Sequence, residues 1–112
     1  MVSVPFNVLA SLDGRDVGMV SASRASHGEV ELFSLWVDPS ARGCGVGDAL
    51  VEAVIDRAVV EAALRVVLVV REQGHRAIDL YLRNGFVDTG VVEPSAGDEP
   101  HERKMVRMLE AR

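Results

Sequence analysis

The residues of this chain best suited to chemistry form a glycine-rich run at positions 42–47, Arg-Gly-Cys-Gly-Val-Gly. The run lies between an apolar segment, residues 30–37, and a long amphipathic pattern that begins at Asp48. Glycines let the backbone approach a ligand closely, while the start of a helix leaves N–H groups free and carries roughly half a positive charge. The run therefore predicts a backbone cradle for a pyrophosphate, as part of a nucleotide-containing cofactor.

The spacing of the glycines narrows the choice of cofactor. A P-loop would need Gly-Lys-Ser or Gly-Lys-Thr, and neither follows here. The dinucleotide fingerprint G-x-G-x-x-G, counted from Gly43, would place Asp48 at its third glycine, where a carboxylate would oppose the pyrophosphate. What remains is the pattern R-x-x-G-x-G, with Arg42, Gly45 and Gly47 in place.

This pattern resembles the coenzyme A loop of the GNAT superfamily of N-acyltransferases. Two further motifs match that family, one on each side of the loop: Leu35-x-Val37-x-Pro39 and Ala77-x-x-x-Tyr81-x-x-x-Gly85-Phe86. Together the motifs and their surroundings cover about residues 29–90. The strand-like segments on either side also suit the family.

The resemblance implies a mixed α/β fold. Its sheet is mainly antiparallel, with one splayed pair of parallel strands and two packed helices, and a single domain covers residues 1–112. The chain starts at what would be the second strand of the family, so we expect it to lack the first strand and the first two helices, which usually wall the acceptor site. A minimal enzyme with an open groove, a dimer whose partner completes the wall, and a mis-set start codon all fit this expectation.

The resemblance also implies a set of site residues. In the family the pantetheine arm of coenzyme A enters between the splayed strands, and a tyrosine near the thioester sulfur, here Tyr81, protonates the leaving thiolate. A glutamate six residues before Val37, here Glu31, acts as a base directly or through water. The expected cofactor-binding residues are Leu35, Trp36, Val37, Arg42, Gly43, Cys44, Gly45, Val46, Gly47, Asp48, Gly74, Ala77 and Tyr81.

Several of these residues also have a purely structural interpretation. Glu31 could be a solvated strand carboxylate, with Glu29 as a weaker substitute on the same face. Tyr81 could be a core aromatic residue of an amphipathic helix. Cys44 is expected to fill space as a small side chain rather than to carry an acyl group, and Gly74 departs from the asparagine that many family members have there.

Arginines outside the loop lack motif support. We expect Arg71, Arg76 and Arg83 to lie on solvated faces of a loop or helix.

The elements that must position these residues can be predicted from hydrophobic periodicity and turn signals. We expect strands at residues 6–11, 16–23, 30–37, 66–70, 86–92 and 103–109, and helices at residues 48–63 and 75–84. Asp13 and Gly14 form a hairpin turn between the first two strands. The uninterrupted apolar run at residues 66–70 predicts an interior strand covered on both faces and parallel to residues 30–37.

The second helix should bury a defined set of side chains. We expect Ala77, Ile78, Tyr81 and Leu82 in the core, and Gly85 to end the helix in a left-handed conformation.

Composition excludes several classes of protein. The 112 residues are 48% hydrophobic, enough for one core, and a net charge of -5 argues against nucleic-acid binding. The longest apolar run is far too short to span a membrane, and the N-terminus lacks signal-peptide features, so we expect no membrane partner and a cytoplasmic location. One cysteine cannot form an intrachain disulfide, and the three histidines lack metal-ligand spacing, so no metal is expected.

The predicted function is direct transfer of an acetyl group from acetyl-CoA to a primary amine of a small molecule, peptide or protein. The alternative is a non-catalytic acyl-CoA sensor or interaction subunit, which Gly74 and the short N-terminus favour. Apolar Val2, Val4 and Phe6 at an exposed sheet edge predict a homodimer.

Overall fold

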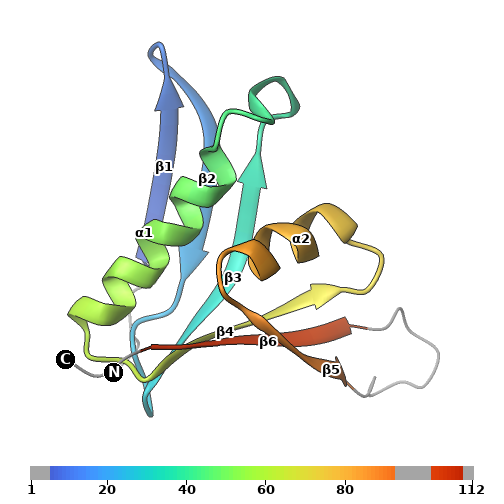
Figure 1. Cartoon of the computed structure of the whole chain (residues 1–112). Helices are drawn as coiled ribbons and strands as arrows, with labels where there is room; N and C mark the ends of the chain where they lie inside the picture. Colours follow the sequence, from blue (N-terminus) through green and yellow to red (C-terminus); the bar gives the residue numbers. More distant parts are fainter. Residues whose placement is uncertain (1–5, 93–101, 110–112) are drawn as a thin grey trace.

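The computed structural model describes residues 6–92 and 102–109, which form one sheet with two α-helices on it (Figure 1). The elements follow in the order β1 (Phe6–Leu12), β2 (Arg15–Ala22), β3 (Glu29–Val37), the short 3₁₀ helix η1 (Pro39–Ala41), α1 (Val46–Val60), β4 (Arg65–Arg71), α2 (His75–Arg83), β5 (Val87–Val92) and β6 (Glu102–Met108). The predicted order of three strands, helix, strand, helix and two strands is confirmed.

The strands lie in the order β1-β2-β3-β4-β6-β5, and β3 and β4 are the parallel pair among otherwise antiparallel neighbours. The predicted mixed, mainly antiparallel sheet with one parallel pair is therefore confirmed. Helix α1 packs on β1, β2 and β3, and Figure 1 shows α2 farther along, beside β3 and above β4. No helix in the described part of the chain is long and apolar enough to cross a membrane.

The β1–β2 hairpin turns at the two predicted residues. Asp13 and Gly14 both have positive φ, 51° and 78°, as the tight turns that match the twist of paired strands require. β1 then lies at the edge of the sheet. Of the apolar residues expected to mark this edge, Phe6 is half-buried beneath the Arg57 guanidinium, while Val2 and Val4 lie outside the described residues.

Strand β3 contains a bulge that the sequence did not reveal. Ser34 pairs with Ser21 of β2, but Leu32 pairs with Ala22, so Phe33 is an extra residue in β3. An extra residue reverses the alternation of side chains along a strand. As a result Leu32 before the bulge and Leu35 after it both pack on the core, although three positions separate them.

The parallel ladder between β3 and β4 ends at the same place. It runs from Glu29 opposite Arg65 to Leu32 opposite Leu68 and stops, while β4 continues its antiparallel ladder with β6 as far as Arg71. The two parallel strands thus diverge beyond Leu32. From that point the edge of β3 that faces β4 has no ladder partner among the described residues.

Helix α1 is shorter at its C-terminal end than the periodicity predicts. It ends at Val60 rather than at residue 63, because Ala62 adopts a left-handed conformation with φ of 59° and the N–H of Ala63 returns to the carbonyl of Ala58. Its apolar face, which includes Leu50, Val51 and Val54, is fully buried against the sheet.

Two burial predictions need correction. Leu82 is 47% exposed, and Leu80 takes its place in the core beside Tyr81, because α2 is rotated so that Leu80 meets the first turn of α1. In β4, Val69 is 45% exposed instead of covered, because it points to the face of the sheet opposite the core residues Leu68 and Val70. The predicted end of α2 is confirmed, since Gly85 has a φ of 90°.

Candidate functional site

The site begins where β3 ends, at a turn held by Asp38. The Asp38 carboxylate accepts hydrogen bonds from the backbone N–H of Ser40 (2.9 Å) and from its hydroxyl (3.0 Å), and these bonds hold the pKa of Asp38 below its usual value. The Asp38 N–H is in turn bound to the carbonyl of Val17 in β2 (2.8 Å). These hydrogen bonds attach the turn to β2 just before the glycine run begins.

The glycine run forms the predicted cradle at the start of α1. Gly45 is the N-cap residue, with φ of 78°, and offers no side chain to the free N–H groups of the helix. None of the described residues accepts a hydrogen bond from the N–H of Gly45, Val46 or Gly47. These donors and the positive end of the helix dipole are together suited to holding an anion.

Gly47 has a second role, which its spacing alone did not reveal. A Cβ atom on Gly47 would lie 3.2 Å from a methyl carbon of Leu80 and 3.8 Å from one of Val37. Such contacts are tight, so glycine allows the first turn of α1 to approach α2 closely.

A cavity of about 780 Å³ lies in front of the cradle. Its walls come from the end of β3, the glycine run, the first turn of α1 and one side of α2: Leu35, Trp36, Val37, Ala41, Arg42, Gly43, Gly45, Val46, Gly47, Asp48, Arg76, Ala77, Asp79, Leu80, Tyr81 and Arg83. The structure therefore brings together all but two of the predicted cofactor-binding residues. The two are Cys44, which is exposed and does not fill space as expected, and Gly74.

Gly74 lines a second cavity, of about 500 Å³, between the divergent ends of β3 and β4. The two cavities share four lining residues, Leu35, Trp36, Ala77 and Tyr81, so they adjoin. An elongated ligand can therefore run from the cradle into the gap between the strands. There it meets the unpaired backbone edge of β3, which can accept a peptide-like arm as it would another strand.

Tyr81 stands where the two cavities meet. Its side chain is 6% exposed, and its ring makes an edge-to-face contact with Phe86, with 5.6 Å between centroids. Burial raises the pKa of Tyr81 to about 12, so the phenol stays protonated at neutral pH. Tyr81 is thus a protonated phenol that lines both cavities.

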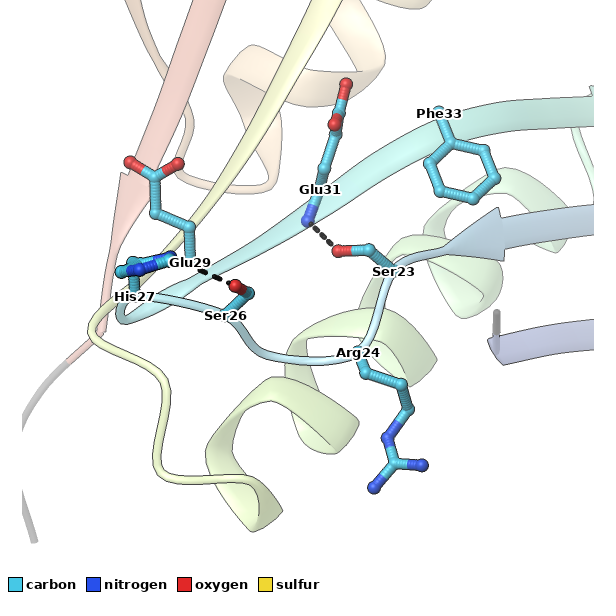
Figure 2. A pocket seen from close by; sticks show the side chains of 7 residues that line it. All are labelled: Ser23, Arg24, Ser26, His27, Glu29, Glu31 and Phe33. Atoms are coloured by element: carbon cyan, nitrogen blue, oxygen red, sulfur yellow. Dashed lines mark hydrogen bonds between the residues drawn. The ribbon is translucent and has the colours of Figure 1, made fainter. Parts of the chain in front are cut away.

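Glu31 lies in a different pocket, of about 490 Å³, at the start of β3. Figure 2 shows the Glu31 side chain rising from the strand, while its backbone N–H binds the Ser23 hydroxyl (2.9 Å). Phe33, the bulge residue, lines both this pocket and the gap between β3 and β4. Glu31 and Tyr81 are thus not in one cavity but on either side of the bulge.

Glu29 shares the pocket and the direction of Glu31, as strand alternation predicts (Figure 2). Its carboxylate is bound by Arg65 (2.7 Å), and this hydrogen bond lowers the pKa of Glu29. In the described part of the chain, no residue donates a hydrogen bond to the carboxylate of Glu31. Of the two glutamates, Glu31 is the one that is available to a ligand.

The sequence predicts Arg71, Arg76 and Arg83 on solvated faces, and all three are exposed, but each also lies beside a cavity. Arg76 and Arg83 line the cavity in front of the cradle, and Arg71 lines the gap between the strands. The signal that could have identified the two helical arginines is their spacing, because residues seven apart lie on one side of a helix.

Known proteins resemble this chain in both sequence and structure. The sequence model of the acetyltransferase (GNAT) family matches residues 3–86. Over 78 residues the chain is 37% identical to an uncharacterized N-acetyltransferase of Mycobacterium tuberculosis strain H37Rv, covering 70% of this chain and 50% of that protein. The chain thus spans about half the length of the curated relatives it matches.

Solved structures show the same arrangement of strands and helices. Ard1 from Thermoplasma volcanium is 29% identical, with a TM-score of 0.82 over 92% of this chain and 70% of that chain. An acetyltransferase structure from Bacillus anthracis, solved in complex with acetyl coenzyme A, has a TM-score of 0.85 at 17% identity, over 95% of this chain and 63% of that one. At that identity the second likeness concerns the fold alone.

The burial of Tyr81 predicts a loss of stability at alkaline pH. The folded pKa of about 12 exceeds the unfolded value of roughly 10, so the contribution of Tyr81 is full below pH 10 and is lost as pH rises toward 12. Between pH 10 and pH 11 the free energy of unfolding should fall by about 1 kcal/mol more in the wild type than in Tyr81→Phe. Urea unfolding of both proteins between pH 8 and 11 measures this difference, and parallel curves would contradict it.

Proposed function

The chain belongs to the acetyltransferase (GNAT) family, and from this membership we propose that it transfers an acetyl group from acetyl-CoA to a primary amine. The observation that carries the proposal is the continuity between the cradle at the start of α1 and the gap between β3 and β4. An anion site that leads into a slot with unpaired backbone groups suits a cosubstrate with a pyrophosphate at one end and an amide-bearing arm at the other.

The residues present fit coenzyme A. The pyrophosphate would be held by the N–H groups of Gly45, Val46 and Gly47, with Arg42 as a neighbouring cation. Arg76, across the cavity on α2, is a second cation for phosphate groups. The pantetheine arm would take its backbone hydrogen bonds from residues 35–37. The cosubstrate supplies the reactive group, an acetyl thioester.

The reaction requires two proton transfers: the attacking amine must lose a proton, and the departing thiolate must gain one. We assign the first to Glu31 and the second to Tyr81, which lie on either side of the bulge. The amine nitrogen attacks the thioester carbonyl carbon, so that a C–N bond forms and the C–S bond breaks. Glu31 takes the proton of the amine, through a water molecule because it lies in the neighbouring pocket. Tyr81 gives its proton to the departing thiolate, because its phenol lines the cavities in which the thioester would lie and is protonated at neutral pH.

The acceptor is an amine on a small molecule, peptide or protein. It would enter through the pocket of Glu31, which the bulge residue Phe33 connects with the gap between the strands.

A homodimer formed through the exposed edge of β1 stays a prediction, supported by the place of β1 at the end of the sheet. A monomeric mass by light scattering over a range of concentrations would contradict it.

The proposed activity is tested by titrating the protein with acetyl-CoA in a calorimeter and then following thiol release with a panel of amines. We expect binding and amine-dependent release, and Arg42→Glu should lose binding because it places a carboxylate beside the cradle. Binding without turnover on any amine would favour an acyl-CoA sensor instead. Absence of binding would contradict both functions.

The assigned roles of Tyr81 and Glu31 make separate predictions. Tyr81→Phe should lower kcat about a hundredfold and leave acetyl-CoA binding intact, because only the proton is removed. Glu31→Gln should lower the rate at neutral pH, because an amide cannot take the proton of the amine. The matched control is Glu29→Gln, since Glu29 lies on the same face but is bound to Arg65. Equal effects of the two glutamine substitutions would exclude a specific role for Glu31.

A further inference from the structure

The carboxylate of Asp48, in the first turn of α1, is held by two residues from the end of α2. Arg83 donates from Nε to Oδ1 (2.9 Å) and from Nη2 to Oδ2 (3.0 Å), and the Asn84 side-chain amide donates to Oδ1 (2.8 Å). These bonds, with that of Arg83 the strongest influence, hold the pKa of Asp48 below its usual value. Arg83 and Asn84 follow Asp48 by 35 and 36 residues in the sequence, so these bonds join the two helices.

This cluster resolves a conflict at the cradle. A carboxylate beside the free N–H groups of α1 would repel an anionic ligand, and Asp48 lines the same cavity as those groups. The bidentate pair with Arg83 compensates its charge. Arg83 also lines the cavity, but its guanidinium is engaged by Asp48.

The same cluster reaches Tyr81 through the backbone. The Asn84 side chain that binds Asp48 also donates to the carbonyl of Leu80 (2.8 Å), and the Asn84 N–H donates to the carbonyl of Tyr81 (3.1 Å). Leu80 in turn packs against Gly47, the residue before Asp48. The end of α2 that carries Tyr81 is therefore attached to the turn of α1 that forms the cradle.

We propose that Asp48 is a positioning residue, which by binding Arg83 and Asn84 holds Tyr81 at the correct place relative to the anion cradle. The inference rests on the proposed function, in which Tyr81 protonates the leaving thiolate. It assigns to Asp48 a role distinct from cofactor binding: its carboxylate acts on the helix that carries the proton donor.

The first test separates catalysis from acetyl-CoA binding. Asp48→Asn and Arg83→Gln should each lower kcat about tenfold, because either one releases the end of α2. They should differ in KM for acetyl-CoA. Asp48→Asn removes a negative charge from the cavity and should leave KM unchanged or lower, whereas Arg83→Gln leaves the carboxylate uncompensated and should raise KM several-fold. Loss of fold by itself would move both variants in the same way.

The matched control is Asp56→Asn, which makes the same change of charge on an exposed side of α1, two turns beyond Asp48. It should stay within about twofold of the wild type in kcat and KM. If Asp56→Asn lowers kcat as much as Asp48→Asn does, the effect is one of net charge and the proposal is overturned.

A double-mutant cycle tests whether Asp48 acts through Tyr81. In a Tyr81→Phe background, Asp48→Asn should cause almost no further loss of kcat, because the proton donor is already absent. Independent losses that multiply would show that Asp48 acts elsewhere and would overturn the proposal.

A measurement without turnover separates this proposal from the proposed function. Tyr81 is the single tyrosine of the chain, so ring-labelled tyrosine gives one set of NMR signals that reports on its position. Asp48→Asn and Arg83→Gln should shift or broaden these signals, and Asp56→Asn should not. If the wild type acetylates no amine, the proposed function fails. If the tyrosine signals stay unchanged in Asp48→Asn and Arg83→Gln, the proposal that Asp48 positions Tyr81 is overturned, whatever the activity.

Discussion

The site depends on the point where two parallel strands stop pairing. The ladder between β3 and β4 ends at Leu32 and Leu68, and in the next position Phe33 bulges from β3. β3 keeps β2 and β4 keeps β6 as outer neighbours, so both strand edges that face the divergence lack a ladder partner among the described residues. Because backbone N–H and C=O groups need partners when they are removed from water, these edges predispose the gap to bind a ligand with amides of its own.

The bulge also decides which side chains line the gap. Without an extra residue, Leu35 would point away from the core that Leu32 helps to build, since strand side chains alternate. With it, Leu35 and Val37 rejoin the core, and the backbone between them forms a wall shared by the two cavities. One inserted residue thus keeps the apolar face continuous, and its side chain, Phe33, lines both the pocket of Glu31 and the gap beside Tyr81.

The two helices complete the site because the first turn of α1 meets the last turn of α2 at the cradle. The start of α1 is stabilised by no capping side chain, which leaves its N–H groups available at a cost in helix stability that an anion can offset. The bonds from Arg83 and Asn84 to Asp48, and the packing of Leu80 on Gly47, supply cohesion at this point instead. The free N–H groups of the cradle and the buried phenol of Tyr81 therefore lie on two helix turns that contact each other.

The sequence alone determined the order of the elements, the hairpin at Asp13 and Gly14, the cradle, and the end of α2 at Gly85. These features depend on residues close together in the chain, where glycine conformations and hydrophobic periodicity act directly. For the same reason the family could be predicted from short motifs with fixed spacing.

Tertiary structure alone decided the bulge at Phe33, the choice of Leu80 over Leu82 for the core, and the pairing of Asp48 with Arg83. Each depends on contacts between segments far apart in the chain. A nine-residue helix such as α2 has several apolar positions, and the surface it meets selects which of them is buried. Likewise the sequence places the Asp48 carboxylate beside the cradle, but its partner Arg83 can be identified only from the fold, which brings the end of α2 next to the start of α1.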